Sequence, residues 1–105
     1  MELNIDQPEV LREFAYAQGW LPRGVEILRL EIADAESAHI NIRSFFSDDT
    51  TLIFQQPLSN GDTAAGAQFS LMVDAASALT AKEGHLPTLL GYAEEELILC
   101  LRDAD

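Results

Sequence analysis

Few side chains in this sequence are of a type that does chemistry near neutral pH, and they lie far apart along the chain. There are two histidines, His39 and His85, and one cysteine, Cys100. A metal site needs several ligands at a spacing that fits one turn or one helix face, and neither CxxC nor HxxxH occurs here. Cys100 stands among leucines, where burial would raise the thiol pKa and leave it unreactive. We therefore expect no catalytic residue and no metal site.

One short pattern has the spacing of a nucleotide site without its chemistry. Gly61 and Gly66 are as far apart as the two glycines that open a P-loop. Ala67 and Gln68 then stand where that loop needs a lysine and a serine or threonine. A triphosphate would find no neutralising charge there, so we expect no cofactor.

Negative charge is the unusual property of the composition. Eighteen acidic residues against six basic ones give a net charge of −12, and Lys82 is the only lysine. Such a field repels nucleic acid and anionic membranes and steers basic proteins inward. We expect a basic protein partner, with no direct binding of nucleic acid or membrane.

The residues that we single out for partner binding are acids from turns and a loop, together with the only tryptophan. They are Asp48, Asp49, Asp62, Glu94, Glu95, Glu96 and Trp20. The carboxylates would form one electronegative face if folding brings them together, and the tryptophan is of a type that anchors interfaces. Two structural alternatives stay open: Glu94–Glu96 would protect the apolar run 97–101 from aggregation, and Trp20 would pack back on the first helix.

The N-terminal stretch DQPEVLREFAYAQGWLP predicts one capped helix. Asp6 is the candidate N-cap, at the start of a capping-box spacing. Gly19 favours a left-handed stop, after which Trp20 would fold back on Phe14 or Ala15.

Three strands joined by polar turns are predicted next, and they should pair antiparallel. Their sequences are GVEILRLEIAD, AHINIRSFF and TTLIFQQ. In the first, alternation places Leu28, Leu30 and Ile32 on one side and Arg29 and Glu31 on the other.

The remaining segments are assigned from turn formers and apolar runs. They are a loop at 57–67, a fourth strand at 67–73, a helix from Asp74 to a stop at Gly84, a turn at 87–92 and a final strand from about 95 to 102. The last segment also fits a helical leucine stripe, but Pro87 and Gly91 shorten any helix there.

These elements predict one α+β domain over residues 1–105. An N-terminal helix would pack on a mainly antiparallel sheet of four to five strands, with a second short helix. The single cysteine and the acids Glu2 and Asp6, where a signal peptide would be basic and then apolar, favour a cytoplasmic location.

The stretch LLGYAEEEL at 89–97 resembles the LLGYxxEEL signature of PAS sensor domains. In that family several further strands follow the signature, whereas eight residues follow it here. We carry no PAS cofactor residue over to this chain.

Three functions remain open. The first, which we favour, is a small acidic, non-enzymatic binding protein that neutralises or escorts a basic partner, such as an immunity protein, an inhibitor or a nucleic-acid mimic. The second is a homodimeric chaperone or assembly factor, since small acidic secretion chaperones share the helix-then-strands order. The third is an enzyme or small-ligand carrier whose pocket would use His39, Arg43, His85 and Tyr92.

Overall fold

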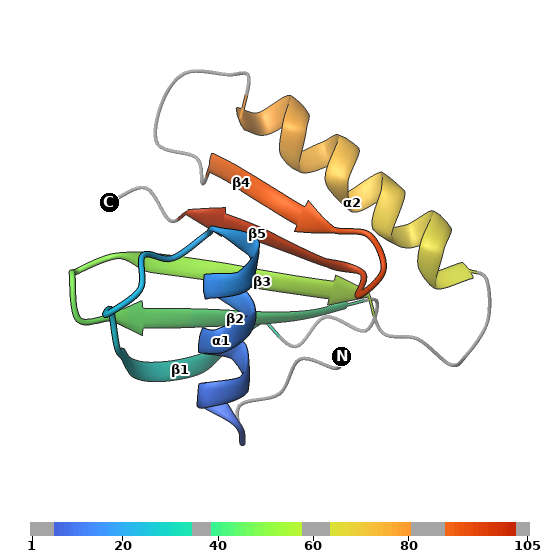
Figure 1. The fold of residues 1–105 in the computed structure, drawn as a ribbon. Coiled ribbons are helices and arrows are strands. Elements are labelled where there is room, and N and C mark those ends of the chain that lie inside the picture. The colour runs from blue at the N-terminus through green and yellow to red at the C-terminus, as the bar shows by residue number, and fades with distance from the viewer. Residues whose placement is uncertain (1–5, 35–38, 58–63, 81–87, 103–105) are drawn as a thin grey trace.

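One antiparallel sheet carries a helix on each face, which confirms the predicted α+β class (Figure 1). The computed structural model describes residues 6–34, 39–57, 64–80 and 88–102. The elements are α1 (Pro8–Gln18), β1 (Ile27–Asp34), β2 (His39–Phe46), β3 (Thr51–Pro57), α2 (Ala64–Thr80), β4 (Thr88–Ala93) and β5 (Ile98–Arg102). The strand order is β1-β2-β3-β5-β4, so β1 and β4 form the two edges of the described sheet.

Alternate residues of the inner strands β3 and β5 face different helices. Towards α1, the buried layer is Leu11, Ala15, Leu21, Ile42, Phe46, Leu52, Phe54, Ile98 and Cys100. Towards α2, it is Ile53, Phe69, Ala76, Leu99 and Leu101. Both faces of β5 are therefore covered, and this explains why its sequence is apolar at successive positions instead of alternating.

The predicted limits of α1 are confirmed at its end and corrected at its start. Gly19 adopts φ 79°, and the backbone N–H of Trp20 donates to the carbonyl of Ala15 at 3.0 Å. The N-cap, however, is Gln7, without a side-chain capping hydrogen bond, so the prediction that Asp6 caps the helix is wrong. Pro8 is the reason, because proline holds the residue before it out of the helical conformation and begins the helix itself.

The expected alternation in β1 is broken by an irregularity in its pairing with β2. The register shifts between Ile27 and Arg29, and Leu28 is 68% exposed. Ile27 and Leu30 are the β1 residues that pack against the α1 layer. The prediction that Leu28 shares the core side with Leu30 is therefore wrong, because a bulge inserts one extra residue.

The predicted strand at 67–73 is wrong, because this segment belongs to α2. The helix begins at Ala64, ten positions before the predicted N-cap Asp74. Its sheet-facing residues are Phe69, Met72, Val73 and Ala76, and this i, i+3, i+4, i+7 spacing is helical. The ends of the predicted loop at 57–67 belong to regular elements, since β3 includes Pro57 and α2 begins at Ala64. Residues 58–63 and the predicted stop at Gly84 lie outside the described residues. No described helix is long and apolar enough to cross a membrane.

The predicted turn at 87–92 is also wrong, while the final strand is confirmed as β5. Thr88–Ala93 forms the edge strand β4, which pairs with β5. Gly91 lies within β4, where the pairing with β5 shifts register between Leu89 and Gly91, and the indole of Trp20 lies against it. A Cβ atom at this position would stand 2.5 Å from Trp20 Nε1, so the glycine permits close packing instead of a turn.

Candidate functional site

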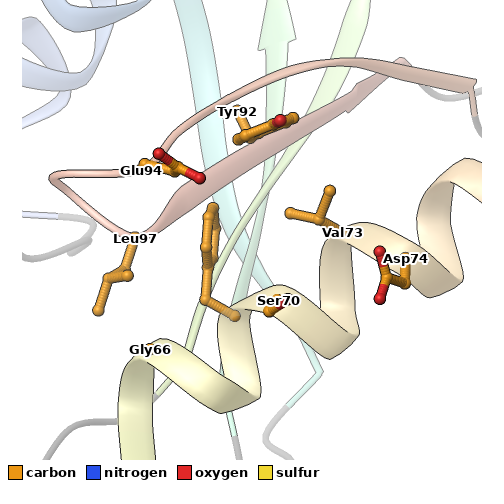
Figure 2. A pocket seen from close by; sticks show the side chains of 8 residues that line it. Gly66, Ser70, Val73, Asp74, Tyr92, Glu94 and Leu97 are labelled. Atoms are coloured by element: carbon orange, nitrogen blue, oxygen red, sulfur yellow. The ribbon is translucent and has the colours of Figure 1, made fainter. Parts of the chain in front are cut away.

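A cavity of about 420 Å³ lies between α2 and the turn that joins β4 to β5 (Figure 2). We call it the hairpin cavity. Its lining residues are Gly66, Phe69, Ser70, Val73 and Asp74 of α2 and Tyr92, Glu94 and Leu97 of the hairpin. The volume is in the range of pockets that hold small ligands.

The helical wall of the cavity follows from the spacing of α2. Phe69 and Val73 face the sheet, and both line the cavity. Ser70 and Asp74 lie four residues apart and therefore share the neighbouring flank of the helix. Figure 2 shows Val73 pointing towards Tyr92 across the cavity. The helix thus supplies an apolar base with one hydroxyl and one carboxylate beside it.

The opposite wall of the cavity is the turn between β4 and β5, whose backbone is fixed by strand pairing and by hydrogen bonds. Ala93 pairs with Ile98, and the N–H of Leu97 donates to the carbonyl of Glu94 at 3.3 Å. Leu97 has φ 59°, a conformation that non-glycine residues adopt only where the surroundings hold it. The side-chain amide of Gln56 donates to the carbonyl of Glu96 at 2.9 Å and ties the turn to β3.

Aromatic rings line the middle of the cavity. Phe69 is 3% exposed, whereas Tyr92 is 48% exposed. Their ring centroids are 6.1 Å apart at an interplanar angle of 66°, an edge-to-face arrangement. The buried ring therefore supports the exposed one.

The lining residues are suited to binding a positive group. Asp74 and Glu94 supply carboxylates from the two walls, Ser70 and Tyr92 supply hydroxyls, and none of the lining residues is basic. Within the described part of the chain, no three His, Cys, Asp or Glu side chains gather closely enough to hold a metal ion. Carboxylates beside an aromatic ring attract organic cations.

The only cysteine is remote from this chemistry. Cys100 is fully buried in the α1 layer, and burial raises its thiol pKa far above the ordinary value. The thiolate is the reactive form, so this side chain is unreactive in the folded protein.

The structure does not bring the predicted acids to one face. Asp48 and Asp49 form the β2–β3 turn, and Glu94–Glu96 form the β4–β5 turn at the other end of the sheet (Figure 1). The antiparallel pairing of Leu52 with Arg102 places the first turn beside the end of β5, not its start. Asp62 lies outside the described residues. Of these acids, Glu94 alone lines the hairpin cavity.

Trp20 is half-buried and packs on the protein's own core. Its ring lies 5.5 Å from that of Phe14 and 6.2 Å from that of Phe54, measured between centroids. The predicted folding back on the first helix is therefore confirmed. A further role for Trp20 in partner binding stays a prediction.

Of the four polar groups expected in a ligand pocket, the structure places Tyr92 at the cavity. Arg43 is half-buried on β2 and is not a lining residue, His39 begins β2, and His85 lies outside the described residues. Sequence reasoning missed Ser70 because a strand was assigned to 67–73, and it assigned Asp74 as a helix N-cap and not as a binding residue. The helical spacing from Phe69 to Ala76 was the signal that would have found them.

The outer surface of α2 is the second notable feature. Asp74 is the only charged residue among the 17 of this helix. The side opposite the sheet carries Ala67, Leu71, Ala75 and Ala78, all exposed, and we call these four residues the outer stripe. A contiguous stripe of exposed apolar residues often marks a surface that contacts another molecule.

Comparison of the chain with models of protein families, with curated proteins and with solved structures found no match.

Proposed function

We propose that this protein is a non-enzymatic binding protein that acts as a homodimer and escorts a basic protein partner. The observation that carries the proposal is the outer stripe of α2. Its central residue, Leu71, is 66% exposed in the single chain. A covering chain would remove this apolar surface from water.

A second copy of the chain is the best occupant of the outer stripe, because a two-fold axis can pair the stripe with itself. Two molecules that each carry a net charge of −12 repel one another. This repulsion opposes dimerisation least where the surface carries the fewest charges, and α2 has one charged residue, Asp74. The alanines beside Leu71 would let two such helices approach closely.

A helix alone offers little area for a stable dimer, and the adjacent edge strand adds to it. α2 has 17 residues and so is about 25 Å long, whereas stable interfaces bury about 800 Å² on each partner. α2 packs against β4, the edge of the described sheet. There Leu90 is 40% exposed, so α2 and this edge together provide the proposed interface.

The charge of the protein supports a basic partner. The net charge of −12 accelerates association with a positive surface and opposes association with a negative one. The unpaired, buried Cys100 suits a reducing compartment, and we extend the proposal to a cytoplasmic location.

Sedimentation equilibrium of the wild-type chain and two matched variants tests the dimer. Leu71→Glu and Leu28→Glu each add one negative charge at a leucine of nearly equal exposure, 66% and 68%. We expect the wild type and Leu28→Glu to be dimers and Leu71→Glu to be a monomer. A wild type that stays monomeric at high concentration would contradict the proposal, as would a dimer that survives Leu71→Glu.

Stopped-flow association with an oligo-arginine peptide tests the basic partner. We expect the association rate to fall steeply as salt rises from low ionic strength to about 0.5 M, because screening shortens the reach of the field. An oligo-glutamate peptide of equal length is the control and should not bind. A salt-insensitive association rate would overturn this part of the proposal.

A further inference from the structure

The ring of Tyr92 in the hairpin cavity has no cation over it from the described part of the chain, unlike two other aromatic rings of this protein. The guanidinium of Arg29 lies 4.3 Å from the ring centroid of Phe45, and that of Arg23 lies 5.3 Å from the centroid of Tyr16. Those two rings are half-buried, whereas Tyr92 is exposed. Among the described residues, no arginine or lysine lies over Tyr92.

The same cavity holds carboxylates that lack a basic counterpart within the described residues. Asp74 reaches it from α2 and Glu94 from the hairpin, and both are exposed at its rim. Elsewhere in the described chain, ion pairs join Arg12 to Glu13 and Glu26, and Arg29 to Glu31. Two negative groups and an open ring thus face the same space.

The shape and chemistry of the cavity favour a side chain with an apolar stem over an ion. Val73 and Leu97 provide aliphatic surface beside the carboxylates. Arginine and lysine bury their methylene stems on such surface while the charged head meets acids or an aromatic face. An anion would be repelled.

We propose that the hairpin cavity binds an arginine or lysine side chain of the protein partner. This inference rests on the proposed function, because it assigns the contact through which a basic chain is held. The cation stacks on Tyr92 between the carboxylates of Asp74 and Glu94, and its stem lies along Val73.

The test is an NMR titration of the ¹⁵N-labelled full chain with a capped Gly-Gly-Arg-Gly-Gly peptide. The same peptide with citrulline, a neutral isostere of arginine, is the matched control probe. We expect the arginine peptide to shift the amide signals of Ser70, Asp74, Tyr92 and Glu94, and the citrulline peptide to leave them in place. Equal shifts with both peptides would overturn the proposal, as would an arginine peptide that shifts none of these signals.

Three single variants test the individual groups. Asp74→Asn, Glu94→Gln and Tyr92→Leu should each weaken binding of the arginine peptide about two- to fivefold, the range for one exposed ion pair or cation–π contact. Glu95→Gln makes the same charge change one residue from Glu94 at an exposed position that does not line the cavity, and it should change affinity less than about twofold. Equal losses in Glu94→Gln and Glu95→Gln would show only the general field of the protein and would refute a specific site.

Two further experiments test whether the second copy of the chain, or a free small cation, occupies the cavity in place of the partner's side chain. If Leu71→Glu binds the arginine peptide and the wild-type dimer does not, the cavity is filled by the second copy, and its assignment to the partner is wrong. Agmatine carries the guanidinium without a peptide backbone, and tighter binding of agmatine than of the peptide would also overturn that assignment. A wild-type dimer in which neither probe shifts the cavity signals overturns this inference while leaving the homodimer intact.

Discussion

The helices α1 and α2 cover opposite faces of one sheet but present different surfaces to their surroundings. α1 buries Leu11 and Ala15 and carries Glu9, Arg12 and Glu13 elsewhere on its 11 residues. Arg12 also forms an ion pair with Glu26 at 2.7 Å, between Nη1 and Oε2, which ties the outside of α1 to the chain before β1. α2 is longer and has a single charged residue.

This difference separates what folding requires from what it leaves open. Each helix needs one apolar side to pack on the sheet, and both have it. The opposite side is not constrained by the fold, and charge there costs little. α2 exposes four apolar residues there beside one acid, Asp74, and such a surface is typical of a helix that contacts another chain.

The largest expected effect compares a buried leucine of α1 with an exposed leucine of α2. Leu11 is 2% exposed and Leu71 66% exposed. Leu11→Ala should lower the free energy of unfolding by about 2–5 kcal/mol, because it leaves a cavity in the core. Leu71→Ala should change it by less than about 0.5 kcal/mol. Urea unfolding followed by circular dichroism, at a dilution where the wild type is monomeric, measures both, and equal losses would show that α2 has no free outer side.

The next effect compares glycines on the two sides of the sheet. Gly91→Ala should lower the free energy of unfolding by about 1–3 kcal/mol, because the new methyl group would overlap the indole of Trp20. Gly66→Ala in α2 meets nothing within 4 Å and should raise the free energy of unfolding by about 0.5–1 kcal/mol through helix propensity. A tolerated Gly91→Ala would mean that Trp20 does not pack tightly on β4.

A smaller effect concerns the end of α1. Gly19 has φ 79° with nothing within 4 Å of a Cβ position, so a side chain there is opposed by backbone strain and not by contact. Gly19→Ala should lower the free energy of unfolding by about 1 kcal/mol, and Gly19→Asn by less, because asparagine tolerates this conformation better. Equal losses in the two variants would argue against strain as the cause.

The smallest effect lies at the β2–β3 turn, outside both helices. A hydrogen bond with the Thr50 side chain lowers the pKa of Asp48, and the backbone N–H of Thr50, 3.0 Å from Asp48 Oδ1, adds to this. A lowered folded-state pKa adds stability that is complete above the unfolded value of about 3.9 and disappears as pH falls through the folded value. The stability difference between wild type and Asp48→Asn should therefore shrink between about pH 5 and pH 2, and only slightly, because the carboxylate is exposed. A difference that grows on acidification would contradict this assignment.

Some features were accessible from the sequence because they depend on neighbouring residues. The end of α1 depends only on Gly19, and the β2–β3 turn depends only on its polar residues. The burial of β5 is visible in four successive apolar residues, ILCL at 98–101. Ser70 of the candidate site was missed because AQFSLMV suits both a strand and a helix, and the strand assignment made Asp74 the N-cap of a shorter helix. The contacts of Phe69 with the α2 layer, which are distant in sequence, decide between them.

The sequence by itself determined the α+β class, the end of α1, the apolar character of β5 and the negative charge, since each follows from local pattern or composition. Only the tertiary structure decided that Gly91 lies within a strand, that the acids of the two turns lie at opposite ends of the sheet, and that α2 and the β4–β5 hairpin enclose a cavity. These features depend on strand order and register. Such pairings join residues far apart along the chain, and no local preference specifies them.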